Sequence, residues 1–143
     1  MDDLKLIVQG GEPSPEYKKV IVDGLLANHA IKGHPRKPKE IFSILLKDNA
    51  GNVLGGIIAS ILWNGMEIES LWVDDSIRGK GGGRKLMDAT EKEGIKRGCN
   101  ISYTNTFSWQ APDFYEKLGY TLYGKLDGFP EGNGLSYYSK KLS

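Results

Sequence analysis

The sequence predicts an α/β (α+β) fold, in which helices flank a mixed, mostly antiparallel sheet of six to seven strands. Two hairpin signals, at residues 48–51 and at Asn64-Gly65, separate apolar runs and predict three consecutive antiparallel strands. The third run leads into a glycine-rich loop and a helical pattern, after which alternating runs return. Hairpins combined with a strand–helix–strand unit predict a mixed sheet in a single domain spanning residues 1–143.

The composition restricts the class of protein before any motif is considered. A chain of 143 residues with a formal net charge of +1 favours one globular domain. The balanced charge argues against nucleic acid or an anionic membrane as partners. The apolar run at residues 53–63 contains glycines and is too short to span a bilayer. Cys99 is the sole cysteine, which excludes an internal disulfide and favours a cytoplasmic location.

The first half of the chain is expected to contain four strands and one helix. Alternation predicts a first strand at residues 4–8, and Ser14 followed by Pro15 predicts a helix start. Residues 29–39 hold both histidines and are expected to form a loop; without a cysteine or carboxylate at ligand spacing, no metal site is expected there. The remaining three strands of this half are predicted at residues 40–47, 52–62 and 66–73.

The second half is expected to contain two helices and three strands. A long helix is predicted at about residues 81–97 with Gly98 as its C-cap, and a short helix at residues 110–118 is ended by Gly119. The three strands are predicted at residues 100–107, 120–126 and 135–142.

Residues 71–86, read as LWVDDSIRGKGGGRKL, form the segment best suited to binding an anion. Four glycines lie within positions 79–83 and permit backbone N–H groups to approach a ligand closely. The start of the following helix adds unpaired N–H donors and the positive end of its dipole. We therefore expect a phosphate-bearing ligand at this loop, which is flanked by Arg78, Lys80, Arg84 and Lys85.

Two common phosphate-binding motifs do not fit this loop. A P-loop requires Gly-x-x-x-x-Gly-Lys-Ser/Thr, which the chain lacks. A dinucleotide fingerprint requires Gly-x-Gly-x-x-Gly, but its last position falls on Arg84 or Leu86. The pattern Arg/Gln-x-x-Gly-x-Gly/Ala does fit, through Arg78, Gly81 and Gly83.

This pattern resembles the GCN5-related N-acetyltransferases (the GNAT superfamily). The string Leu-x-Val-Asp-x-x-x-Arg-Gly-x-Gly-x-Gly is matched from Leu71 to Gly83, and a second signature, A-x-x-FYEKLGY, runs from Ala111 to Tyr120. The shorter strings LWV, TFS-x-QAP and FP-x-G resemble those of small bacterial members. The resemblance covers essentially the whole chain and implies the GNAT fold, with a sheet splayed at its middle strands.

The resemblance also implies which residues bind acetyl-CoA. In this family the preceding strand pairs with the pantetheine arm of the coenzyme as an added strand would, which carries over to Leu71, Trp72 and Val73. Backbone amides of the glycine loop hold the pyrophosphate, which carries over to Arg78, Gly79, Lys80, Gly81, Gly82, Gly83 and Arg84.

The chemistry implied is acyl transfer from the thioester to an amine. The family's tyrosine matches Tyr115, which is expected to act as the general acid that protonates the departing thiolate. Glu67 falls where several members keep a catalytic glutamate, whereas other members use an ordered water. Because strands have a two-residue period, Glu67 and Glu69 are expected on the same side, and either could deprotonate or bind the acceptor.

The sequence departs from the family pattern at two positions. An asparagine that often contacts the coenzyme, seven residues before the tyrosine, is replaced by Ser108, for which Asn105 could substitute. The FP-x-G string often continues with histidine, but here it continues with Asn133. A role for Cys99 in an acyl-cysteine intermediate is the lesser alternative to direct transfer.

The leading hypothesis is an acetyl-CoA-dependent N-acetyltransferase without a metal, acting on a small-molecule amine. The two carboxylates favour a cationic acceptor; a protein N-terminus or lysine is the second choice. A non-catalytic acyl-CoA sensor of the same fold is an alternative from a different class, and a nucleic-acid module is disfavoured by the charge balance. The sequence leaves open the oligomeric state, a homodimer included.

Overall fold

The computed structural model describes residues 3–143. The chain divides into two units, Met1–Lys37 and Pro38–Ser143. In the first unit, helix α1 (Pro15–Ile31) begins at Ser14, whose hydroxyl accepts a hydrogen bond from the N–H of Tyr17. The predicted strand at residues 4–8 is wrong, since these residues belong to no strand. Alternation alone does not suffice, because a strand also needs a partner for its backbone N–H and C=O groups.

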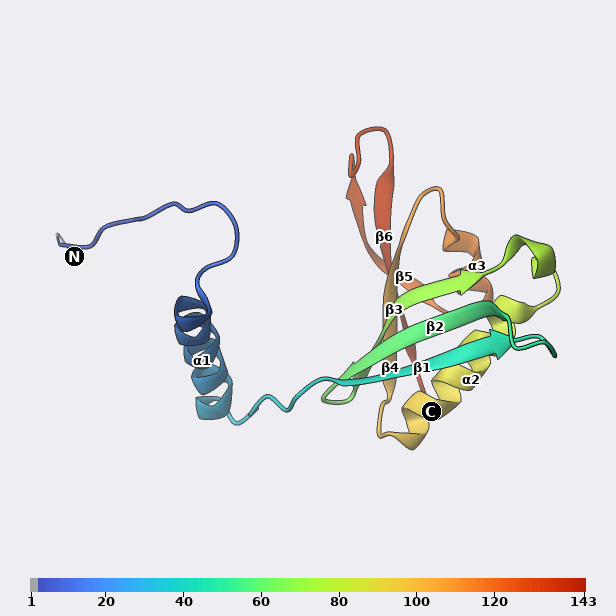
Figure 1. Cartoon of the computed structure of the whole chain (residues 1–143), viewed down its shortest axis with the longest axis horizontal. Coiled ribbons are helices and arrows are strands. Elements are labelled where there is room, and N and C mark those ends of the chain that lie inside the picture. The colour runs from blue at the N-terminus through green and yellow to red at the C-terminus, as the bar shows by residue number, and fades with distance from the viewer. Residues whose placement is uncertain (1–2) are drawn as a thin grey trace. The chain divides into compact units, whose positions relative to one another are not determined.

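The second unit holds a six-stranded sheet in the order β1-β2-β3-β4-β6-β5 (Figure 1). Neighbouring strands are antiparallel except for β3 and β4, which are parallel. The sheet therefore confirms the predicted mixed, mostly antiparallel architecture and six of the seven predicted strands. Its strands are β1 (Glu40–Lys47), β2 (Val53–Leu62), β3 (Gly65–Val73), β4 (Ile101–Phe107), β5 (Thr121–Asp127) and β6 (Gly134–Lys141).

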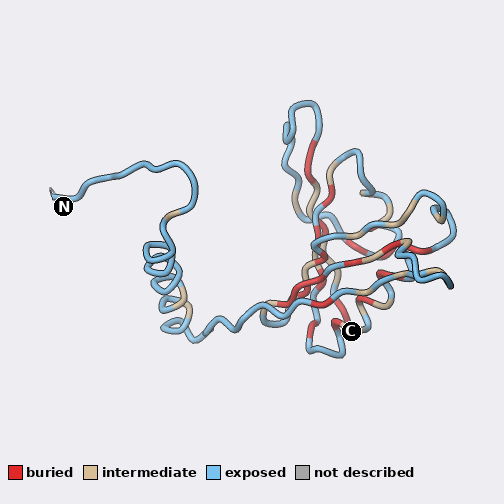
Figure 2. The backbone as a smooth tube through the Cα atoms, in the orientation of Figure 1, coloured by how far each residue is buried: buried red, intermediate tan, exposed pale blue. Residues whose placement is uncertain are grey.

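Three helical segments accompany the sheet in the second unit: η1 (Asp75–Ile77), α2 (Gly82–Lys96) and α3 (Pro112–Lys117). Helix α2 packs against β1, β2 and β3 through one buried side. At Gly94 an added Cβ would lie 2.7 Å from the sulfur of Met66, so the absence of a side chain permits this close approach. Figure 2 shows the buried residues of this unit along the sheet and the elements packed on it.

The core of this unit joins the sheet to both helices. Ile57 on β2, Met66 on β3 and Met87 on α2 belong to one buried cluster, together with Tyr115 of α3 and Tyr138 of β6. Tyr115 therefore belongs to the core as well as to the segment that carries the second sequence signature. No helix within residues 3–143 has both the length and the apolar character required to cross a membrane.

Two irregularities in the middle of the sheet determine where a ligand can enter. The β2–β3 register shifts between Ile58 and Ala59, which leaves Glu69 as an extra residue on β3, a β-bulge. Strands β3 and β4 pair only where Gly65–Glu67 faces Ile101–Tyr103. Beyond this point the strands separate, which confirms the expected splay at the middle of the sheet.

Candidate active site

The glycine loop is shaped by a capped turn at the end of β3. The carboxylate of Asp74 accepts hydrogen bonds from the N–H and the hydroxyl of Ser76, at 3.0 and 2.5 Å. These bonds, with a smaller effect from the charge of Arg78, hold the pKa of Asp74 below its ordinary value. Gly79 and Gly81 then take φ angles of +77° and +81°, a region that L side chains rarely adopt.

The start of α2 presents backbone donors that have no hydrogen-bond partner in the described part of the chain. The first bond of the helical ladder runs from the N–H of Lys85 to the carbonyl of Gly81, at 3.0 Å. The N–H groups of Gly82, Gly83 and Arg84 precede it. No side chain among residues 3–143 caps this end, and its first turn holds no acidic residue. These features fit an anionic group such as a pyrophosphate, because unpaired donors and a helix dipole both favour negative charge.

A cavity of about 890 Å³ extends from this loop into the gap between β3 and β4. Its walls come from β3, the glycine loop, β4 and α3, all within the second unit. The Thr104 hydroxyl donates to the carbonyl of Ile68 at 3.0 Å, which bridges the two strands after their pairing has ended. Of the predicted site residues, those that line the cavity are Glu69, Leu71, Trp72, Val73, Arg78, Gly79, Gly81, Gly82, Gly83, Arg84, Asn105 and Tyr115.

Three predicted residues, Glu67, Lys80 and Ser108, are not among the residues that line this cavity. The Ser108 hydroxyl instead donates to the side-chain carbonyl of Asn133 at 2.7 Å. Ser108 therefore ties the loop after β4 to the turn between β5 and β6. Asn105, the suggested substitute for the missing asparagine, does line the cavity.

The loop arginines are partly engaged by the protein. Arg78 pairs with Asp75 at 2.9 Å, and both side chains are mostly exposed. Arg84 donates to the carbonyl of Lys117 at 3.4 Å and so connects α2 with α3. Arg84 can therefore support the position of α3 as well as contribute positive charge to the cavity.

Tyr115 lies at the inner wall of the cavity with 6% of its surface exposed. Its ring packs edge-on against Phe114 and Tyr120 and stacks on Tyr138. Burial raises the pKa of Tyr115 above its ordinary value, and a hydrogen bond with Thr104 partly offsets this effect. The phenol therefore keeps its proton at neutral pH.

The two predicted carboxylates occupy different places. Glu69, the bulge residue, lines the cavity and accepts a hydrogen bond from the Ser60 hydroxyl at 3.0 Å, with the ammonium of Lys39 at 4.0 Å. Glu67 is in register with Tyr103 on β4. Burial raises the pKa of Tyr103, and the charges of both Glu67 and Glu69 raise it further. Both carboxylates therefore raise the pKa of Tyr103, although only Glu69 lines the cavity.

Several residues that line the cavity were missed by the sequence reasoning. The side-chain oxygen of Gln110 accepts a hydrogen bond from the N–H of Phe107 at 2.7 Å and shapes the loop before α3. Thr104 and Thr106 line the cavity from β4. The alternation of Thr104 and Thr106 along a strand was the available signal, but polar residues at that period more often mark a solvated face.

A splayed mixed sheet with a glycine-rich loop at the start of α2 is typical of the class of coenzyme-A-dependent acetyltransferases. The family model described as "Acetyltransferase (GNAT) family" matches residues 13–120. The chain belongs to the GNAT family of acetyltransferases, and it is an N-acetyltransferase enzyme. The family uses acetyl-CoA.

Individual relatives agree with this assignment. The chain is 31% identical to blasticidin-S acetyltransferase from Streptomyces morookaense over 97 residues, or 67% of this chain and 71% of the relative. It is 28% identical to acetyltransferase Atu2258 from Agrobacterium fabrum over 127 residues, or 89% of this chain and 92% of the relative. A crystal structure of an acetyltransferase from Bacillus cereus matches with a TM-score of 0.80 at 27% identity, covering 94% of this chain and 98% of that one.

Proposed function

We propose that this protein transfers an acetyl group directly from acetyl-CoA to a small cationic amine, with Tyr115 as general acid. The observation that carries the proposal is one cavity lined by the glycine loop, Tyr115 and Glu69. In this proposal an anion site, a proton donor and a negative charge for the acceptor would share a single space.

The glycine loop would hold the coenzyme phosphates. The open N–H groups of Gly82, Gly83 and Arg84 would bind oxygens of the pyrophosphate, and the absence of Cβ atoms at Gly79 and Gly81 leaves space for them. The unpaired part of β3 next to the gap, at residues 71–73, would offer backbone groups to the pantetheine amides. When bound, acetyl-CoA supplies an acetyl group activated as a thioester.

Tyr115 is suited to give a proton to the sulfur of the leaving thiolate. An alkyl thiol has an ordinary pKa of about 8.5, below that of a phenol, so proton transfer to a free thiolate is uphill and the phenol must share its proton with the sulfur as the C–S bond breaks. Because burial raises the pKa of Tyr115, the phenol is fully protonated before each turnover. The phenol oxygen regains its proton from water after transfer.

Glu69 is the better placed of the two carboxylates to meet the acceptor. An amine has a pKa of about 10.4 and must lose a proton before it can attack. Glu69 can bind the ammonium form and receive that proton, directly or through a water, while Ser60 fixes its orientation. Glu67 is paired with Tyr103 on β4 and would add negative charge farther from the cavity.

The relative named for blasticidin S makes that compound one reasonable acceptor to include in a screen. The test is a panel of blasticidin S, spermidine, tyramine and a short peptide with a free N-terminus, each mixed with acetyl-CoA and assayed by thiol release. We expect at least one small amine to release thiol faster than the peptide, and Glu69→Gln to raise its KM. Tight binding of CoA without thiol release from any amine would instead support the acyl-CoA sensor.

A further inference from the structure

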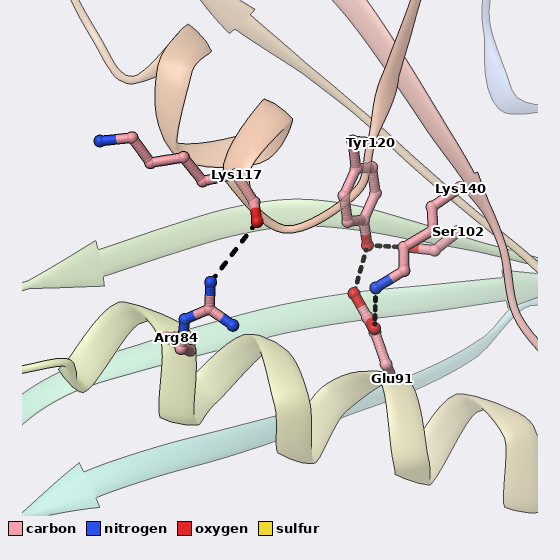
Figure 3. Close-up of polar contacts among 6 residues, drawn as sticks. All are labelled: Arg84, Glu91, Ser102, Lys117, Tyr120 and Lys140. Carbon is pink, nitrogen blue, oxygen red and sulfur yellow. Dashed lines mark hydrogen bonds and ion pairs between the residues drawn. The ribbon is translucent and has the colours of Figure 1, made fainter.

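A partly buried polar network connects Glu91 of α2 with Tyr120, Ser102 and Lys140 (Figure 3). The Glu91 carboxylate of α2 accepts a hydrogen bond from the Tyr120 hydroxyl at 3.0 Å and pairs with the Lys140 ammonium at 2.8 Å. The Tyr120 oxygen lies 2.7 Å from the hydroxyl of Ser102 on β4. The Tyr120 hydroxyl is therefore linked directly to α2 and β4, and through Glu91 to Lys140 on β6.

The stability of the fold alone does not account for this network. The side chains of Glu91 and Lys140 are 12% and 29% exposed, so both charges are largely removed from water. Pairs of this kind contribute little net stability, because loss of hydration offsets much of their attraction. What they do provide is a fixed position for the groups bonded to them, here the Tyr120 hydroxyl.

Tyr120 in turn contacts the proposed general acid. The rings of Tyr115 and Tyr120 pack edge-on, with centroids 5.7 Å apart and planes inclined by 69°. On another side, the ring of Tyr138 lies 6.2 Å from that of Tyr115, and its hydroxyl donates to Glu116 at 3.0 Å. The ring of Tyr115 thus contacts two tyrosines, each of which is fixed at its hydroxyl by a carboxylate.

We infer that Glu91 and Lys140, acting through Tyr120, are positioning residues for Tyr115. This inference rests on the proposed function, in which Tyr115 donates a proton. Neither Glu91 nor Lys140 lines the cavity, so neither is expected to touch the coenzyme or the acceptor.

Glu91 lies on the same helix, α2, as the proposed anion site, so the network connects that site with Tyr120. The start of α2 forms the anion site, and Glu91 lies nine residues further along, about 14 Å at 1.5 Å per residue. One helix would therefore hold the coenzyme phosphates at its start and position Tyr115, through Glu91 and Tyr120, further along. Arg84 adds a second connection from α2 to α3 through the carbonyl of Lys117. Misplacement of a reacting group by about 1 Å can lower a rate by about 100-fold, so this spacing matters for turnover.

The test uses Tyr120→Phe, which keeps the ring but removes its hydroxyl, and Glu91→Gln, which weakens the pairing with Lys140. Both are assayed with acetyl-CoA and the amine of highest rate in the panel. We expect kcat to fall about tenfold while the KM for acetyl-CoA stays within about twofold. The matched control is Glu93→Gln, which breaks an ion pair with Arg97 on the same helix at 3.1 Å and should leave kcat unchanged.

A double-mutant cycle distinguishes positioning from a general structural role. If Tyr120 acts through Tyr115, adding Tyr120→Phe to Tyr115→Phe should cause no further loss of kcat. Losses that multiply, or a kcat for Tyr120→Phe equal to that of the wild type, would overturn the inference while leaving the proposed function intact. If Tyr115→Phe itself has no effect, or no amine releases thiol, the proposed role of Tyr115 falls and the inference falls with it.

Discussion

Replacement of Gly81 by alanine tests the assignment of the glycine loop most cleanly. Gly81 has a φ of +81°, and an added Cβ would meet no atom within 4 Å. The penalty is therefore backbone strain alone, about 1–2 kcal/mol for an L residue in this conformation. A loss of that size corresponds to a fall in Tm of about 3–7 °C for a chain of 143 residues.

The same change should weaken acetyl-CoA binding, because an alanine that relaxes to negative φ turns the first N–H groups of α2 away from the anion. Loss of one hydrogen bond to a charged group costs about 1.5–3 kcal/mol, so we expect binding to be about 10- to 100-fold weaker by titration calorimetry. Gly128→Ala is the matched control, since Gly128 has a φ of +73° and equally open space in the β5–β6 turn. Both variants should lose stability, but only Gly81→Ala should lose affinity. Equal affinity in the two would refute the assignment of this loop.

Three further predictions concern the chemistry and the core. Because burial raises the pKa of Tyr115 above its ordinary 10.0, kcat should be lost only as the pH rises above about 10; a basic limb well below this value would contradict the role of Tyr115. Cys99→Ala should keep kcat within about twofold, because burial and, to a smaller extent, the charge of Glu40 raise the pKa of the thiol and leave little thiolate. Loss of activity in this variant would favour an acyl-cysteine intermediate. Ile57→Ala should lower the free energy of unfolding by about 2–5 kcal/mol in urea denaturation, because this side chain is 1% exposed in the core; a smaller loss would mean that the site collapses around the change.

Most of the fold could be predicted from local patterns. The two hairpins, the long helix after the glycine loop and the final strands all follow from turn residues and apolar periodicity, which act over a few residues. The strand at residues 4–8 was wrong because alternation does not supply a partner. The bulge at Glu69 was also missed, since it arises from the register between β2 and β3, and a register depends on two segments at once.

The candidate site was predictable where it consists of a continuous segment. The loop from Arg78 to Gly83 and the position of Tyr115 both follow from short motifs, and the structure brings them to one cavity. The network of Glu91, Tyr120 and Lys140 could not be foreseen, because its members come from α2, the segment before β5, and β6. Only the packed sheet brings these three residues together.

The most direct test of the account is the kcat of Tyr115→Phe, measured by thiol release with acetyl-CoA and the best amine of the panel. Phenylalanine keeps the ring contacts with Phe114, Tyr120 and Tyr138, so the fold and the Kd for acetyl-CoA should be retained. Loss of a general acid should lower kcat by about 100- to 10,000-fold. A variant that binds acetyl-CoA normally and turns over at the wild-type rate would contradict the account.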